Sequence, residues 1–254
     1  MKLQARATIL LLAALPLLAG CGGNWGWHVV DPRDSRGQAN LSFMLSGFWA
    51  TVSLSLSTML LSVLLGLAVA MMGMARFRVL RWTNRAYVEL FRAIPILVMI
   101  LWVFYGLPVV LDIRLDVFVA AMLAIAICDS AFEAEIFRAG IQSVEQGQRE
   151  AAMALGLSPW QRMRFVILPQ AIRRVLPPIA NQFIYVVKMS SLASVIGYQE
   201  LTRKANELVV TVFRPLEIYT ILILEYLVLI LCISFAVRWL EKKMGADQGV
   251  RRVG

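Results

Sequence analysis

The stretch that decides the fold is Gly147-Gln-Arg-Glu-Ala-Ala-Met-Ala-Leu-Gly-Leu-Ser-Pro-Trp-Gln-Arg-Met-Arg-Phe-Val-Ile-Leu-Pro169, the longest polar interruption between the apolar runs of the chain. Its alanines favour a helix, and Gly156 can adopt the left-handed conformation that ends one. Ser158 has the pattern of an N-cap, because Pro159 follows in the first helical position and Gln161 stands three residues after the cap. The closing proline disturbs the second helix. The sequence therefore predicts a helix–turn–helix hairpin, and its small residues allow another backbone to approach closely.

The apolar runs around this hairpin are long enough to cross a membrane. The chain is 59% hydrophobic and 16% charged, whereas soluble domains are about half apolar and a quarter charged. The five runs cover about 43–74, 86–111, 115–141, 175–198 and 216–239. The sequence therefore predicts an all-α integral membrane protein with five core transmembrane helices.

The basic residues give the predicted orientation. The net charge of +9 could suggest a nucleic-acid partner. Most of the 25 lysines and arginines, however, flank the apolar runs on the side of the hairpin, as the positive-inside rule expects. We therefore expect a lipid bilayer around the chain and no nucleic acid, with the hairpin and the tail 244–254 in the cytoplasm.

The amino-terminal segment 1–21 leaves alternatives open. Its apolar run is short for a span and resembles a secretory signal with small residues at its end. The last four residues, Leu18-Ala19-Gly20-Cys21, also look like a bacterial lipoprotein cleavage box. The segment is thus a cleaved leader, a leader lipidated at Cys21, or an extra span that is retained. In each case residues 22–42 form an outer, periplasmic segment, with loop composition over 31–37.

Several kinds of site are absent from the sequence. His28 is the only histidine, and the three cysteines have no metal-ligand or disulfide-framework spacing. No Gly-Lys dipeptide occurs, so the phosphate-binding P-loop is missing. We expect no catalytic residue, no metal and no cofactor in this chain, so any ATP and Mg²⁺ are bound by a partner.

The hairpin also carries a family resemblance. Glu150-Ala151-Ala152, followed by Gly156 and then by residues 166–169, resembles the EAA motif of ABC-importer permeases. In that family the hairpin, here about 144–169, is the coupling helix, which sits in a groove of a cytoplasmic ATPase subunit. The residues that the resemblance implies for this contact are Gly147, Gln148, Glu150, Ala151, Ala152, Gly156, Leu157, Ser158 and Arg162.

Three further segments resemble permeases for polar amino acids, of the histidine/glutamine type. They are 87–95, which reads Tyr-Val-Glu-Leu-Phe-Arg-Ala-Ile-Pro, 135–141 and 188–197. The resemblance implies a type I ABC-importer-like bundle over 43–243 in the bacterial inner membrane. It also implies three partners: an ABC ATPase dimer, a second permease that is identical or homologous, and a periplasmic substrate-binding protein.

Charged side chains within the spans are candidates for the substrate path, because charge at membrane depth is costly. Asp129 and Glu133 are four residues apart and share a helix face, so they can attract a cationic group or make helix-to-helix contacts. The substrate-path candidates are Asp129, Glu133, Lys188 and Ser191. The expected structural pairs are Glu89 with Arg92 and Glu135 with Arg138, and Lys188 can pair with Glu225.

The sequence thus predicts the transmembrane subunit of an ATP-driven importer of polar amino acids, and whether these include basic ones stays open. It is a transport subunit and not itself an enzyme. The alternatives are an ion-coupled secondary transporter, for which the sequence has no visible inverted repeat, and a membrane anchor without transport. The identity of the amino acid, and whether the permease pair is identical or mixed, stay open.

Overall fold

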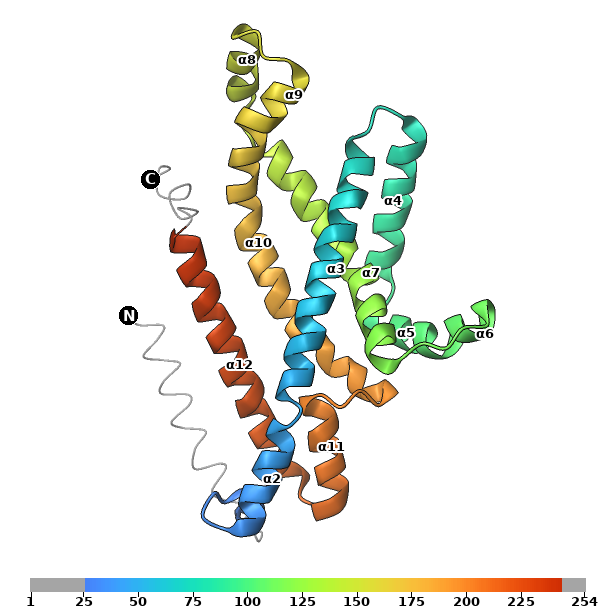
Figure 1. Cartoon of the computed structure of the whole chain (residues 1–254), viewed down its shortest axis with the longest axis vertical. Coiled ribbons are helices and arrows are strands. Elements are labelled where there is room, and N and C mark those ends of the chain that lie inside the picture. The colour runs from blue at the N-terminus through green and yellow to red at the C-terminus, as the bar shows by residue number, and fades with distance from the viewer. Residues whose placement is uncertain (1–25, 244–254) are drawn as a thin grey trace.

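The structure is a computed structural model that describes residues 26–243, and every regular element in that part of the chain is helical. The helices form an elongated bundle (Figure 1). The hairpin of α8 (Gln146–Ala154) and α9 (Pro159–Arg162) stands at one end, and α2 (Ser35–Leu45) and α11 (Leu201–Val212) stand at the other. The leader predicted over 1–21, including Cys21, and the tail 244–254 lie outside the described residues.

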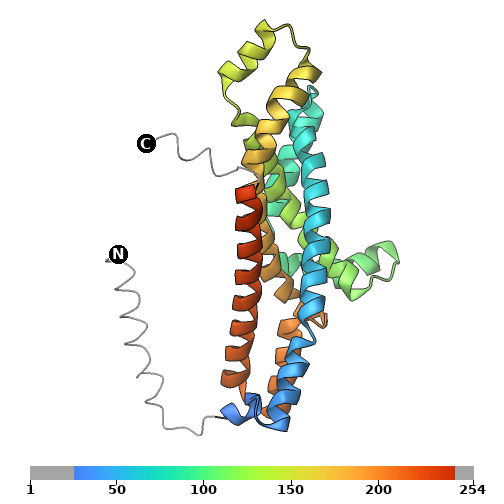
Figure 2. The ribbon, with the colours of Figure 1, turned by 60° about the vertical axis from the view of Figure 1, so that its left-hand side comes forward.

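Four helical stretches are long and apolar enough to cross a membrane. They cover Ser35–Met74, Val117–Gln142, Pro159–Ile196 and Pro215–Trp239. Their main helices are α3 (Phe48–Met74), α7 (Val117–Gln142), α10 (Leu168–Met189) and α12 (Pro215–Lys243). Figure 2 shows α12 along the length of the bundle beside α10.

The second predicted span is broken. The run expected over 86–111 begins earlier, as α4 (Arg78–Ala93), and α4 is bent by 100° from the helices that follow it. Ile94 and Pro95 are extended at the break, since a residue before proline is disfavoured in helical conformation. Residues 26–243 therefore contain four helical stretches that could each cross a membrane, and a fifth if the bent pair crosses it as one unit.

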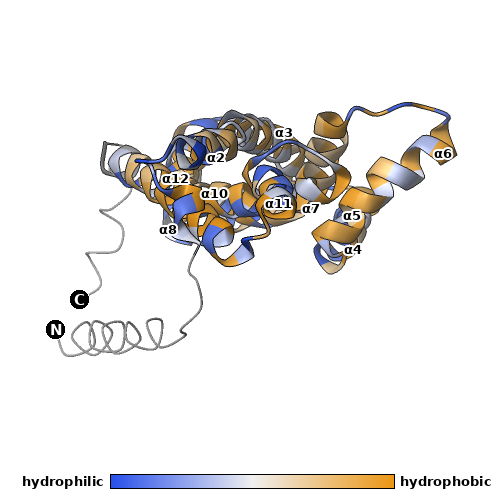
Figure 3. Cartoon of the chain, turned by 90° about the horizontal axis from the view of Figure 1, so that it is seen from below, coloured by the Kyte–Doolittle hydropathy of each residue, from blue (hydrophilic) through white to orange (hydrophobic). Residues whose placement is uncertain are grey.

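Beyond the bend the chain packs partly into the bundle and then leaves it. Helix α5 (Ile96–Leu101) buries Met99 and Ile100 against α7 and α3. A π-helical turn, Trp102–Gly106, and α6 (Leu107–Leu111) follow. Figures 1 and 3 show α6 extending away from the other helices, and its residues Val109 and Val110 are exposed.

The core of the bundle is the contact between α3 and α7. The side of α7 that faces this core is rich in alanine, and small residues allow close helix approach in membranes. Gly66 of α3 lies where a Cβ atom would come within 2.5 Å of the Cβ of Glu133. Gly140 of α7 likewise leaves room for Val175 of α10.

The end opposite the hairpin has its own apolar cluster. It is built from a 3-10 turn at Trp27–Val30, α2 (Ser35–Leu45), the end of α10 at Val187, α11 (Leu201–Val212) and α12 as far as Leu229. The loop predicted over 31–37 is wrong from Ser35 onward, where α2 begins and buries Gly37 and Met44. Helix α11 follows the fourth span and buries Leu201, Ala205 and Leu208.

Candidate functional site

The hairpin folds as its sequence predicts. Helix α8 (Gln146–Ala154) ends before Gly156, whose φ is +72°. Helix α9 (Pro159–Arg162) begins after the N-cap Ser158. Both bonds of the capping box are present: the Gln161 N–H donates to the Ser158 hydroxyl at 3.3 Å, and the Ser158 N–H donates to the Gln161 side chain at 2.8 Å. The turn is thus fixed by its own local chemistry.

The hairpin is anchored at its base and exposed at its tip. The Arg149 guanidinium donates to the Ile141 carbonyl at 2.7 Å, and the Arg174 guanidinium donates to the Ser143 carbonyl. The segment that leaves the end of α7 is therefore fixed to both α8 and α10. Most of the residues expected to contact the ATPase are exposed; Ala152 is buried, and Leu157 and Arg162 are half-buried. The hairpin therefore offers a shaped, accessible surface.

Large apolar side chains at the tip were missed by the sequence reasoning. Leu155 is 78% exposed and Trp160 is 68% exposed, and Met153 is exposed beside them. The available signal was the presence of large apolar residues within an otherwise polar stretch. Exposed apolar groups of this size commonly mark a protein contact.

The hairpin leads into α10 through a π-helical turn at Met163–Ile167. There the Leu168 N–H donates to the Met163 carbonyl, five residues back. Pro169 has no N–H, and its ring clashes with the carbonyl four residues earlier, so a wider turn relieves the conflict. The disturbance that the sequence predicts at this proline is confirmed.

Asp129 joins three helices. Its carboxylate accepts hydrogen bonds from the Ser62 hydroxyl on α3 and from the Gln182 side-chain amide on α10. The side chain is buried. Because buried polar groups are stabilised when they are hydrogen-bonded, this arrangement supports a packing role, and a substrate role for Asp129 stays a prediction.

Glu133 lies one turn further along the same face of α7. It is completely buried against α3, and neither of its carboxylate oxygens has a hydrogen-bond partner among the described residues. A buried carboxyl group without a partner is costly, and such groups are often functional within membranes. Its role in the substrate path also stays a prediction.

Lys188 belongs to an exposed polar stripe on α10. Asn181, Tyr185 and Lys188 are exposed at spacings of four and three residues, so they share one face. The Ser191 hydroxyl donates to the Lys188 carbonyl at 2.7 Å. The expected pair of Lys188 with Glu225 is not formed: Lys188 is exposed, and the buried carboxylate oxygens of Glu225 have no partner within 26–243.

One of the two expected structural pairs is present. Arg138 donates to both carboxylate oxygens of Glu135, at 3.0 and 2.6 Å. The pair of Glu89 with Arg92 is not formed. The Arg92 guanidinium instead lies over the ring of Phe132 on α7, 5.1 Å from its centroid, and this cation–π contact replaces the ion pair.

The part of the chain that the structure describes contains no group of three potential metal ligands. Residues 62–246 match the family described as "Binding-protein-dependent transport system inner membrane component". The chain belongs to this family. The match covers the hairpin, the face of α7 that carries Asp129 and Glu133, the polar stripe of α10 and most of the bundle. The features described above are therefore features of a binding-protein-dependent inner membrane component.

Relatives of this inner membrane component are similar over most of its length. The probable glutamine ABC transporter permease protein GlnM of Bacillus subtilis (strain 168) is 41% identical over 205 residues, covering 81% of this chain and 94% of the relative. The glutamine transport system permease protein GlnP of Escherichia coli (strain K12) is 44% identical over 159 residues, covering 62% and 73% respectively.

A solved structure supports the fold of this inner membrane component. The crystal structure of an amino acid ABC transporter with histidines has a chain that is 36% identical, with a TM-score of 0.76. The likeness covers 80% of this chain and 94% of that one. The expected type I importer-like bundle is confirmed.

Proposed function

We propose that the chain is the transmembrane permease subunit of an ATP-driven ABC importer for polar amino acids. The observation that carries this proposal is the exposed hairpin with the EAA spacing at one end of an apolar helix bundle. The names of the relatives, which include two glutamine permeases, support an amino acid as the substrate. Neither a secondary transporter nor an anchor has a use for such a hairpin.

The hairpin couples the bundle to a cytoplasmic ATPase dimer, which binds the ATP and Mg²⁺. Glu150, Leu155 and Trp160 lie on the exposed surface that enters the groove of the ATPase. The hairpin continues directly from α7 and directly into α10. Closure of the two ATPase subunits therefore moves α7 and α10 together, and these are two of the three helices joined at Asp129.

The substrate path lies along the exposed polar face of α10. A single bundle cannot enclose this path, so a second permease, identical or homologous, forms the opposite wall. Lys188 meets the carboxylate of the amino acid, and Asp129 and Glu133 favour a cationic or amide side chain when α3 and α7 separate. A periplasmic binding protein delivers the substrate to the end formed by α2 and α11, and the carboxyl end of α12 lies in the cytoplasm with the hairpin.

The test is ATP hydrolysis and uptake by the reconstituted complex. Binding proteins loaded with glutamine, arginine or glutamate are supplied in turn. We expect stimulation by one of the first two, and loss of this stimulation when Glu150 is replaced by Ala. If no P-loop ATPase co-purifies with the chain, the proposal is overturned in favour of a secondary transporter or an anchor.

A second measurement tests the carboxylates of the path. We expect Glu133→Gln to lower uptake of arginine relative to glutamine, without loss of assembly. The change removes the negative charge and keeps nearly the same volume. Unchanged arginine uptake would remove Glu133 from the path and leave it as a residue of the α3–α7 contact.

A further inference from the structure

Helix α4 carries two exposed stripes of different chemistry. Arg78, Arg81 and Arg85 follow one another at spacings of three and four residues, so their side chains leave the same face of the helix. Val79, Trp82 and Leu90 form an apolar stripe beside them, and they are 74%, 73% and 55% exposed. The basic and apolar stripes together form a surface that we call the α4 patch.

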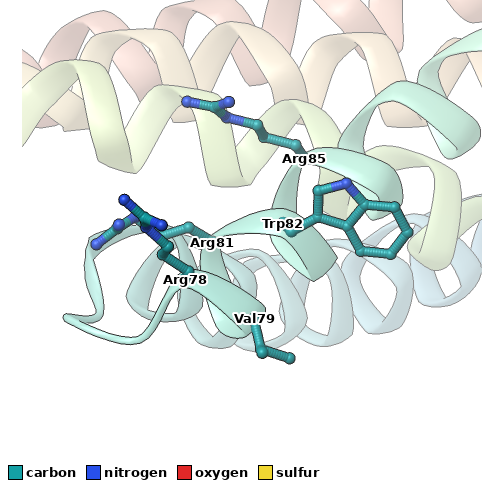
Figure 4. A pocket seen from close by; sticks show the side chains of 5 residues that line it. All are labelled: Arg78, Val79, Arg81, Trp82 and Arg85. Carbon is teal, nitrogen blue, oxygen red and sulfur yellow. The ribbon is translucent and has the colours of Figure 1, made fainter.

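The α4 patch contains a hollow of about 510 Å³. Its lining residues are Arg78, Val79, Arg81, Trp82 and Arg85. In Figure 4 the side chains of Arg78 and Arg81 lie together, Arg85 extends above them, and Trp82 and Val79 point to the other side. Three arginines, Val79 and Trp82 thus line a hollow that has no acidic residue in its lining.

The three arginines differ in what holds them. Arg81 donates from Nη1 to the carbonyls of Ala75 and Arg76, at 3.1 and 3.0 Å, and so closes the turn between α3 and α4. The side chains of Arg78 and Arg85 make no hydrogen bond or ion pair with any residue of 26–243. Two guanidinium groups are therefore available to an external anion.

The position of the α4 patch indicates the source of that anion. The turn between α3 and α4 is at the hairpin end of the bundle but stops short of the hairpin tip (Figure 1). It follows directly on the apolar helix α3, so the arginines lie where a span ends. Tryptophan and arginine at such a level are typical of the membrane interface.

We infer that the α4 patch binds an anionic phospholipid of the leaflet on the hairpin side. The phosphate lies among Arg78, Arg81 and Arg85, and the acyl chains follow Val79, Trp82 and Leu90 deeper along α4. Basic pockets beside transmembrane helices bind anionic headgroups in this way. Apolar residues within the same hollow favour a lipid over free phosphate, and the distance from the hairpin tip favours a lipid over the surface of the ATPase.

The experiment uses the full-length chain, delipidated in a neutral detergent and titrated with phosphatidylglycerol or phosphatidylcholine while bound lipid is counted by native mass spectrometry. The test variant is Arg78→Gln with Arg85→Gln, and Arg81 is kept because it closes the turn. Each arginine near a charged membrane surface is worth about a fivefold change in affinity, so phosphatidylglycerol binding should weaken about thirtyfold. Phosphatidylcholine binding should not change.

Two further variants keep the result interpretable. Arg33→Gln with Arg36→Gln removes the same charge from exposed positions at the opposite end of the bundle and should leave phosphatidylglycerol binding unchanged. Arg78→Lys with Arg85→Lys should retain most of it, which excludes a folding defect as the cause. A third pair, Val79→Ser with Trp82→Ser, should weaken phosphatidylglycerol binding and leave the binding of inorganic phosphate unchanged.

Several outcomes would overturn the inference. One is equal binding of phosphatidylglycerol and phosphatidylcholine by the unaltered chain. Another is full competition by inorganic phosphate at millimolar concentration, which would make the patch a simple anion site. A third is loss of ATPase co-purification in the variant Arg78→Gln with Arg85→Gln while lipid binding stays intact, which would make the patch a protein contact.

Discussion

Glu133 of α7 lies directly over Gly66 of α3, so closely that a Cβ atom on Gly66 would stand 2.5 Å from the Cβ of the glutamate. A side chain at residue 66 would therefore force α3, α7 or the Glu133 side chain to move. The contact is one turn of α7 away from Asp129, where α3, α7 and α10 are joined. The separation of α3 from α7 is therefore set by the absence of a side chain at one position.

Replacement of Gly66 by alanine should destabilise the bundle. The added methyl group has no free volume, and overpacking of this kind typically costs about 1–3 kcal/mol. Thermal unfolding of the purified chain in detergent measures the effect as a lower melting temperature. Gly147→Ala is the control, because a Cβ atom at Gly147 meets nothing within 4 Å. Equal melting temperatures for the two variants would contradict the tight contact.

The hydrogen bond between Ser62 and Asp129 should be measurable as a coupling between the two residues. We expect Ser62→Ala to lower the free energy of unfolding by about 0.6–2 kcal/mol, the range for polar contacts between membrane helices. In an Asp129→Asn background the same change should cost less, because the charged acceptor is already gone. A double-mutant cycle of unfolding free energies gives the coupling. Strict additivity would show that the hydroxyl and the carboxylate act independently.

Glu200 should make the stability of the α11 end depend on pH. Its carboxylate caps α11 by accepting the N–H groups of Thr202 and Arg203, at 2.9 and 2.7 Å, and it also accepts the Tyr226 hydroxyl at 2.8 Å. Burial raises the pKa of Glu200 from its ordinary 4.5 to about 7, against these hydrogen bonds, which lower it. The folded chain thus holds a proton that the unfolded chain releases.

The sign follows from linkage. Stability is greatest when Glu200 is protonated, falls as pH rises from about 4.5 to 7, and then levels off. The full effect is at most about 3 kcal/mol. Hydrogen exchange of α11 at pH 6 and pH 8 measures it, and Glu200→Gln should flatten the difference. Glu207→Gln is the matched control, because hydrogen bonds from Gln199 and Arg203 hold the pKa of Glu207 below its usual value. An equal pH response in both variants would rule out Glu200 as the source.

Gly156 should matter for coupling because its backbone is in the left-handed conformation, and not because neighbouring atoms leave no space for a side chain. Its φ is +72°, and a Cβ atom there meets nothing within 4 Å. Alanine at Gly156 therefore pays only for the left-handed conformation, about 1–2 kcal/mol, which shifts the turn between α8 and α9. We expect Gly156→Ala to reduce stimulated ATP hydrolysis while the complex still assembles, and Gly156→Asn to retain more of it, because asparagine adopts the left-handed conformation more readily than alanine. An equal loss in both variants would contradict a requirement for the left-handed turn.

Local chemistry made the turn of the hairpin predictable. The cap at Ser158, the proline after it and the glycine before it specify the turn within a few positions, and α8 ends just before Gly156 while α9 begins directly after Ser158. The half-buried pair of Glu135 and Arg138 was predictable for the same reason, since its two members are three residues apart on one helix.

Contacts between distant segments could not be predicted in this way. The partners of Asp129 lie 67 and 53 residues away, on two other helices. Arg92 has a suitable glutamate on its own helix and still turns to Phe132, because the packing of α4 on α7 brings that ring within reach. Pro95 marks a break in the second span, but the 100° bend depends on how α5 is buried against α3 and α7.

The π-helical turn at Met163–Ile167 has a consequence for angular phase. An α-helix advances 100° per residue, and a π-helical turn holds one residue more than an α-helical turn. A helix face assigned by counting residues across the π-helical turn is therefore misplaced by about 100°. The exposed tip at Trp160 and the polar face at Lys188 consequently cannot be placed by counting along one continuous helix. Deleting a single residue between 163 and 167 would let ordinary α-helical bonding resume with the hairpin still facing the same way. Ordinary α-helical bonding of the unaltered sequence would instead turn the hairpin by about 100° and present a different side to the ATPase.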